Sequence, residues 1–384
     1  MKRVLFLFFT LIYAAFLISC NDEITPGFTV GNITVDVGSG DISGYDYSGY
    51  FPDGKLCFVK NGSNYEMYWA EAGTFKTTAE TTDFSTHFAL LKAGTSTRVI
   101  GYNYWEQSKF PPTDEQAKVN VISGVNENGI WAIGIFPLNS EGVYDGTNTS
   151  GKYVGFFHTE SHWEDNPNFA HKSICVAYSD DYGETWTDMA PIITATSPKG
   201  AAGNTGVGDG CVIRDEKNKR WICYYQGDAP CYFFNNKLLC MAASYDDDAS
   251  SGTWKKWDGT GFTTTAYDDS KKCGGENISI LNLRKVAGAN PSVMWNDYLN
   301  CYVMVYTSWT HKAYISFSSN GTYWTKPQYL LGDDSNPIWY VNLISDEGDL
   351  TGGQSVNMYF SYKQGSVGVY SGQRYIAHVP ITFN

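Results

Sequence analysis

The feature that most constrains the fold is the run SDDYGETW at residues 179–186, which follows the pattern Ser-x-Asp-x-Gly-x-x-Trp. Asp and Gly supply the side-chain-to-backbone bonds and the open dihedral angles of a tight hairpin turn, and Trp186 can pin that turn to the sheet beneath it. The apolar segment 174–178 just before the run indicates a buried strand. The run therefore predicts a β-hairpin turn, and it carries no chemistry of its own.

A weaker copy of the pattern follows the strand-like segment 314–317. Gly321 and Trp324 keep the Gly-x-x-Trp spacing, while Ser319 stands where the pattern has Asp. The two segments together resemble the Asp-box of β-propeller proteins. That resemblance implies a ring of antiparallel hairpins.

A second regularity is a pair of aromatic residues at offsets of 12 and 16 from an Asp or Asn. It occurs as Asp53 with Tyr65 and Trp69, Asp209 with Trp221 and Tyr225, and Asn290 with Tyr302 and Tyr306. Each copy has the pattern of a strand, a polar turn and a second strand. We expect these segments to form equivalent hairpins.

The spacing of the copies predicts the number of blades. Asp209 and Asn290 are 81 residues apart and Asp53 and Asp209 are 156 apart, so one more unit should lie between the first two copies. Segments 129–133 and 153–157 supply it, and a shorter final unit runs from 336 to 379. The expected fold is an all-β, five-bladed β-propeller over residues 48–384, with residues 21–47 as a linker or a ring-closing segment.

The composition is typical of one large all-β domain, and the net charge limits the classes of ligand that the protein is expected to bind. The 384 residues include 16% aromatic residues and 39 glycines. The formal charge of -13 argues against nucleic acid, since we find no concentrated basic patch. A neutral or locally recognised ligand is expected.

The first residues have the layout of a secretion signal: Met1-Lys2-Arg3, an apolar run over 4–18, and Leu-Ile-Ser-Cys at 17–20. Residues 1–20 resemble a bacterial lipoprotein signal peptide, which implies lipidation of Cys20. The acidic residues that follow resemble the surface-export tag of Bacteroidetes lipoproteins. We expect an exported, outer-membrane or cell-surface protein whose membrane partner is reached through the lipid; an uncleaved anchor is the alternative. The other eight cysteines are expected to be mostly buried thiols, with Cys231 and Cys240 the best candidates for a disulfide.

In a propeller blade the first strand lines the central channel and the second runs antiparallel to it. The start of strand one and the end of strand two therefore open on one face. Polar residues at these positions are Asp53, Asp209, Asn290, Glu71, His158, Glu160, His162 and Asp228. The turn at 179–186 is expected on the opposite face.

These units, together with the phrases AASYD at 242–246 and GTWKKW at 252–257, resemble the five-bladed propeller glycoside hydrolases of families 32, 43, 62 and 117 over most of residues 50–384. In those enzymes acidic residues from different blades act as catalytic base, pKa-tuning carboxylate and proton donor. By position the resemblance implies Asp53 as base and Asp209 as the tuning carboxylate. Glu160 is taken as donor, although it lies in the second blade and the family's donor lies in the third.

Glycoside cleavage by two carboxyl groups needs one of them protonated and the other ionised, whichever family the protein resembles. The alternative for Asp53 and Asp209 is that they only form turn bonds at strand starts. His158, Glu160 and His162 alternate onto one side of a strand, where they could tune a proton donor, hold a metal or form a solvated rim. Glu276, in a glycine-rich loop, is the reserve acid.

Aromatic residues near loops could stack on sugar rings, with Trp163 and Trp309 as the best candidates, although most propeller tryptophans pack between blades. The acidic run 246–248 resembles a calcium loop only in charge, so no cofactor is expected and structural calcium is a minor alternative.

Three functions remain open from the sequence. The first is an exported glycoside hydrolase acting on a polysaccharide or oligosaccharide. The second is a non-catalytic glycan-binding propeller lipoprotein, since Asn290 replaces an acid. The third, a sialidase, is weakened because the chain has only six arginines and lacks a Phe/Tyr-Arg-Ile-Pro motif.

Overall fold

The computed structural model describes most of the chain. The described residues are 25–38, 53–61, 64–70, 74–80, 96–100, 125–144, 146–147, 150–163, 166–201, 205–228, 237–280, 288–308, 310–345, 351–363 and 375–384. The regular structure within them is β-strand throughout. No helix long and apolar enough to cross a membrane occurs in these ranges.

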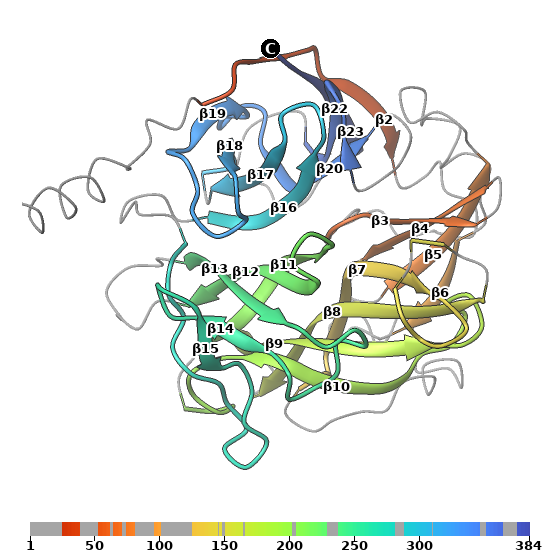
Figure 1. Ribbon diagram of the computed structural model, residues 1–384, viewed down its shortest axis with the longest axis vertical. Helices are drawn as coiled ribbons and strands as arrows, with labels where there is room; N and C mark the ends of the chain where they lie inside the picture. Colours follow the sequence, from red (N-terminus) through yellow and green to blue (C-terminus); the bar gives the residue numbers. More distant parts are fainter. Residues whose placement is uncertain are drawn as a thin grey trace, which may run out of the picture.

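The strands form four hydrogen-bonded sheets, and the nine-stranded one comprises two blades that join where β11 runs parallel to β9. Five blades of mainly antiparallel strands thus surround a common centre (Figure 1). Blade I holds β3 (Cys57–Asn61), β4 (Asn64–Ala70), β5 (Thr74–Glu80) and β6 (Ser96–Ile100). Blade II holds β7 (Gly129–Leu138), β8 (Lys152–Trp163), β9 (Asn166–Ser179) and β10 (Thr187–Thr194). Blade III holds β11 (Thr205–Asp215), β12 (Arg220–Asp228), β13 (Lys237–Ser244), β14 (Lys255–Trp257) and β15 (Phe262–Thr265).

The last two blades complete the ring. Blade IV holds β16 (Gly288–Asn296), β17 (Cys301–Ser308), β18 (Ala313–Ser318), β19 (Gln328–Leu331) and the short β21 (Thr351–Gly352). Blade V holds β20 (Ile338–Ser345), β22 (Ser355–Tyr362) and β23 (Tyr375–Phe383), and its outer strands are β1 (Phe28–Val30) and β2 (Thr34–Gly38). The expected five-bladed, all-β propeller is confirmed.

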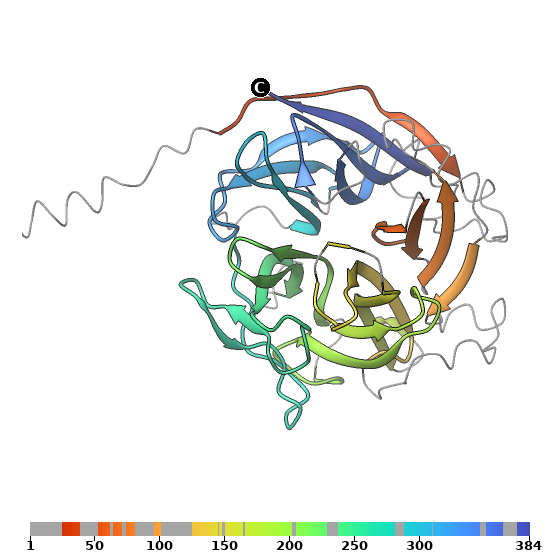
Figure 2. The same ribbon diagram turned by 45° about the vertical axis from the view of Figure 1, so that its right-hand side comes forward.

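The N-terminal strands pair with the C-terminal strand. β1 and β2 both run antiparallel to β23, as Figure 2 shows along the edge of the molecule. Asp36 of β2 lies 3.0 Å from Nδ1 of the buried His378 in β23. One blade is therefore built from N-terminal and C-terminal strands, which closes the ring by main-chain pairing.

Apolar side chains fill the layers between neighbouring blades rather than one central core. One cluster joins strands of blades II and III around Phe156, Ile174 and Trp221, and comparable clusters join the other neighbours along the chain. Because both faces of a blade are covered, its strands read as nearly continuous apolar runs. This packing explains why Trp69, Trp186, Trp221 and Trp254 are fully buried.

The turn at 179–186 joins β9 to β10 and has the expected bonds. Asp181 accepts hydrogen bonds from the backbone N–H of Thr185 (2.8 Å) and from its hydroxyl (2.6 Å). The indole of Trp186 donates to the carbonyl of Gly183 at 3.1 Å. Ser179 pairs with Tyr153, at the end of β8 away from Glu160. The turn therefore lies on the face opposite the predicted site.

The weaker copy differs from its prediction by one residue. Asn320, and not Ser319, accepts the backbone bonds of the turn, from Thr322 at 2.9 Å and Tyr323 at 3.0 Å. Ser318 occupies the place of Ser179 and accepts from the N–H of Gly321. The turn is one residue shorter here, which a fixed-spacing pattern cannot detect.

The predicted equivalent hairpins are confirmed as β3–β4, β11–β12 and β16–β17. Asp209 and Asn290 do not precede their strands as expected, but lie inside β11 and β16 where the register shifts. Cys57, Cys175, Cys211 and Cys223 are buried free thiols, as predicted. Cys231 lies outside the described residues.

Candidate active site at the mouth of the central channel

The five innermost strands surround a cavity of about 60 Å³ on the axis of the ring. Each inner strand contributes to its lining: Lys55 just before β3, Ile133 of β7, Cys211 of β11, Ser292 of β16 and Asn342 of β20. This cavity is the central channel of the propeller. It gives a common reference level for residues from all five blades.

Two residues before each of these positions stand Asp53, Trp131, Asp209, Asn290 and Tyr340. We call these five residues the mouth ring, because they precede the channel residues at the same end of every inner strand. Bulges help to form it: at Asp209, Asn290 and Tyr340 the strand register shifts and φ is 44°, 51° and 52°. Such bulges re-aim side chains, and left-handed conformations at residues other than glycine concentrate at functional sites.

The mouth ring is connected across blades I, II and V. The hydroxyl of Tyr340 donates to Oδ1 of Asp53 at 2.9 Å. Gly54 packs against Trp131, since a Cβ at this glycine would lie 3.2 Å from the indole. The Trp131 ring is in turn 5.1 Å from the ring of His158, between centroids. Asp53 is therefore linked to blade II by packing, because its neighbour Gly54 lies against Trp131 and Trp131 lies against His158.

His158 joins blade II to blade III. Its Nδ1 accepts a hydrogen bond from the backbone N–H of Asp209 at 3.0 Å and lies 3.3 Å from Oδ1 of the same residue. Its Nε2 lies 3.3 Å from Oε1 of Glu160. Burial favours the neutral ring, but the two carboxylates outweigh burial and raise the pKa of His158. Gly208 makes this approach possible, since a Cβ there would lie 2.6 Å from the imidazole.

Glu160 is surrounded by positive and hydrogen-bonding groups. Lys172 Nζ lies 3.2 Å from Oε1, and His162 Nε2 lies 2.6 Å from Oε2. Burial alone would raise the pKa of this carboxyl, but Lys172 and the two histidines outweigh burial and hold its pKa well below the ordinary value. These neighbours therefore favour the ionised form of Glu160.

Lys55 lies buried under the mouth ring. Its Nζ donates to the carbonyl of Val341 at 3.0 Å. Burial lowers the pKa of Lys55, and Cys211, Cys57 and Asp209 only partly offset that effect. The Lys55 amine thus lies in the channel, next to the mouth ring.

Glu276 lies on the same face, over blade III. Its neighbour Asn277 accepts a hydrogen bond from the Tyr225 hydroxyl at 3.0 Å and packs against Gly227 at the end of β12. Gly227 pairs with Val207, at the mouth end of β11. The Glu276 side chain is exposed.

The remaining predicted residues are distributed as follows. Asn290 is buried and its amide donates to the Thr307 hydroxyl at 3.2 Å. Asp228 and Trp163 end β12 and β8, but their side chains are outside the described set. Glu71, Trp309 and Cys20 lie outside the described residues altogether.

Sequence reasoning missed Lys172, Trp131, Tyr340 and Lys55. Lys172 pairs with Glu160 across a long hairpin, and nothing in the sequence sets that register. Tyr340 lacks the aromatic pair that marks the sister blades. Lys55 did leave a signal, since it is a lone charged residue at the edge of an apolar run two positions after Asp53.

Within the described ranges no group of three or more His, Cys, Asp or Glu side chains is arranged to hold a metal ion. In the acidic run 246–248, Asp247 pairs with Arg214 at 2.6 Å.

No protein-family model matches the chain, and no curated protein matches its sequence. Solved structures do match in fold. An α-L-arabinanase from Penicillium chrysogenum, complexed with arabinobiose, is 11% identical with a TM-score of 0.51, covering 90% of this chain and 98% of that one. The GH62 α-L-arabinofuranosidase catalytic domain of Coprinopsis cinerea is 10% identical with a TM-score of 0.50, covering 92% and 98%.

A family 117 glycoside hydrolase of the marine bacterium Zobellia galactanivorans is 11% identical with a TM-score of 0.50, and covers 94% of this chain and 92% of its own. These neighbours are glycoside hydrolases that match nearly the whole chain. At such low identity the match concerns the architecture. The chain thus has the propeller fold found in these glycoside hydrolases.

Proposed function

We propose that the protein is a glycoside hydrolase that cleaves a polysaccharide or oligosaccharide at the mouth of its channel. The observation that carries the proposal is the mouth ring, in which Asp53 and Asp209 from different blades stand at the same end of one channel. The fold of the structural neighbours adds support, since they are glycoside hydrolases.

Asp53 is the proposed general base. Its Oδ1 accepts a hydrogen bond from Tyr340, which orients the carboxylate at the mouth of the channel. An ionised carboxylate can activate a water molecule or attack the anomeric carbon. Trp131, beside Asp53 at the mouth, offers an aromatic face on which a sugar ring can stack.

Asp209 is proposed to position the substrate and tune its neighbours. His158 contacts it from one side and Lys55 lies below it. Glu160 holds His158 in place from the other side. In this arrangement Glu160 fixes the imidazole and does not supply the catalytic proton, which replaces the role expected from the sequence.

The proton donor is then proposed to be Glu276. It is exposed on the mouth face of blade III, beside the end of β12. A proton donor protonates the oxygen of the leaving group. Loss of the donor therefore slows cleavage most for substrates whose leaving group needs that proton. Glu276→Gln should therefore cleave an activated dinitrophenyl glycoside nearly as fast as the parent, while its activity on the natural glycan falls about 100-fold or more.

The direct test is sugar release from a panel of plant, algal and host glycans by the parent chain, Asp53→Asn and Asp209→Asn. Glu141→Gln, an exposed carboxylate in the β7–β8 loop, is the matched control. Sugar release by the parent and the control, with a rate of release about 100-fold or more lower in Asp53→Asn and Asp209→Asn, supports catalysis. Cleavage that survives in both ring variants contradicts the proposal.

A glycan-binding protein without catalysis is the second candidate. The observation that favours it is the state of the described carboxyls near His158, since Glu160 is held ionised by its surroundings. Glycan binding by the parent without any release would identify this function instead.

We also propose that the protein is exported as a lipoprotein through Cys20, on the basis of its N-terminal sequence. Fatty-acid labelling of the parent that disappears in Cys20→Ala would support this. Equal labelling of both proteins would contradict it.

A further inference from the structure

A second cavity lies at the opposite end of the inner strands from the mouth ring. It has a volume of about 210 Å³ and is formed where β7, β11 and β16 end. Phe136 lines both this cavity and the channel, so the two cavities adjoin along the inner strands. We call it the back pocket. It shares no residue with the mouth ring.

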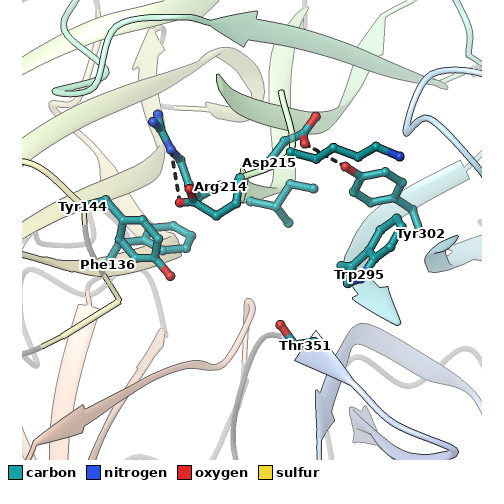
Figure 3. A pocket seen from close by; sticks show the side chains of 10 residues that line it. Phe136, Tyr144, Arg214, Asp215, Trp295, Tyr302 and Thr351 are labelled. Atoms are coloured by element: carbon teal, nitrogen blue, oxygen red, sulfur yellow. Dashed lines mark hydrogen bonds and ion pairs between the residues drawn. The ribbon is translucent and has the colours of Figure 1, made fainter. Parts of the chain in front are cut away.

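Two pairs of aromatic residues form the walls of the back pocket. Figure 3 shows Phe136 and Tyr144 on one side and Trp295 and Tyr302 on the other. Each pair is packed edge to face, with ring centroids 6.0 Å and 4.9 Å apart. This packing holds the rings in place before any ligand arrives, which lowers the entropic cost of binding.

Polar groups at the edge of the pocket are fixed as well. Asp215 accepts hydrogen bonds from the Tyr302 hydroxyl (2.8 Å) and from Nε of Arg220 (2.7 Å). Its side chain is fully buried, so the carboxylate is rigid. Thr351 lies across from it in Figure 3 and is exposed. The buried Asp215 therefore holds Tyr302 in place, and the exposed polar groups that line the pocket are Glu216, Lys217 and Thr351.

The charges around the back pocket cancel. Arg214 is paired with Asp247 at 2.6 Å and lies 3.5 Å from Glu216. Asp215 is paired with Arg220, and Lys217 lies over the Trp295 ring at 5.8 Å. No single sign dominates, so the lining favours a neutral ligand over a strongly anionic or cationic one.

We propose that the back pocket binds one neutral sugar ring of a glycan, as a binding site separate from the mouth ring. A sugar ring presents apolar C–H faces to aromatic walls and hydroxyl groups to the polar rim, which is the combination found here. The volume is below the roughly 300 Å³ at which pockets for drug-sized ligands begin, which suits a single ring. The site would hold a polysaccharide on the protein while its mouth ring stays open.

The experiment is a calorimetric titration of residues 21–384 with D-galactose, L-arabinose, D-xylose and D-glucose. Trp295→Ala removes one wall, and Thr351→Trp fills the pocket from an exposed position without removing a packed side chain. Tyr329→Ala, an exposed tyrosine on β19, is the matched aromatic control. Asp209→Asn tests whether the sugar binds at the mouth ring instead of the back pocket.

We expect at least one of the four sugars to bind the parent, Tyr329→Ala and Asp209→Asn alike, with binding weakened about tenfold or more in Trp295→Ala and Thr351→Trp. The proposal is overturned if none of the sugars binds the parent, or if both pocket variants bind as the parent does. Loss of binding in Asp209→Asn alone would assign the sugar to the mouth ring instead. This site does not depend on catalysis, so binding at the back pocket with no sugar release anywhere would refute only the proposed hydrolase.

Discussion

The imidazole Nδ1 of His158 accepts a 3.0 Å hydrogen bond from the backbone N–H of Asp209, which ties the second blade to the third at the mouth of the channel. The contact depends on a backbone with no side chain in the way, since Gly208 lies directly against the ring. His158 also faces Glu160, so the position of one imidazole sets the relation between two carboxylates.

Replacing Gly208 with alanine should therefore disable the site while the fold survives. The new Cβ would lie 2.6 Å from the imidazole and push it away from Asp209. A displacement of about 1 Å in an active site can cost about 100-fold in rate, and we expect a loss of kcat/KM of that order. Gly261→Ala is the control, because its nearest neighbour would be 3.7 Å from the added Cβ. Activity that is equal in Gly208→Ala and Gly261→Ala would count against this role of His158.

Tyr340→Phe removes the hydroxyl that donates to Asp53 and keeps the ring. A hydrogen bond to a charged group contributes about 1.5 to 3 kcal/mol, so kcat/KM should fall about tenfold or more. Tyr323→Phe, at a tyrosine that is 55% exposed, is the matched control. A kcat/KM in Tyr340→Phe that equals the parent's would contradict a role of this tyrosine in catalysis.

Glu160→Gln should destabilise the protein in a pH-dependent way. Lys172 and the histidines hold the pKa of Glu160 below its ordinary value of 4.5, so the carboxylate stabilises the folded state above about that pH, and the stabilisation is lost as pH falls. At pH 7 the variant leaves Lys172 without its carboxylate partner, and we expect a loss of about 3 kcal/mol. The difference from the parent should shrink below pH 4.5. Urea unfolding across this range measures it.

Glu141→Gln provides the reference for that titration, since its carboxyl is exposed. It should follow the parent at every pH. A Glu160→Gln variant that keeps a constant difference from the parent down to low pH would show that the charge of Glu160 is not what stabilises the fold.

The sequence predicted the architecture because local turn chemistry and spacing repeat in several of the blades. The 179–186 turn and the paired aromatic residues each reflect a requirement that one hairpin imposes on its own sequence. The partners of Glu160 could not be predicted in the same way, because Lys172 approaches it across a hairpin whose register no nearby residue sets. Tyr340 reaches Asp53 from the other end of the chain, so only the closed ring brings the two together.

Asp181→Ala tests whether that turn is purely structural. The variant loses bonds from the backbone and the hydroxyl of Thr185, and we expect the free energy of unfolding to fall by about 1 kcal/mol. Sugar release should not change, because the turn lies at the other end of β8 from Glu160. Asp180→Ala, at an exposed neighbour, should change neither quantity. A large loss of activity in Asp181→Ala with normal stability would place a function on this face.

The most direct measurement for the central claim is a crystal structure of the Asp209→Asn variant soaked with an oligosaccharide that the parent cleaves. The account predicts a sugar chain at the mouth of the channel, stacked near Trp131 and with a sugar oxygen within hydrogen-bonding distance of Asp53. Sugar found away from the mouth ring, with Asp53 and residue 209 contacting none of it, would contradict the account.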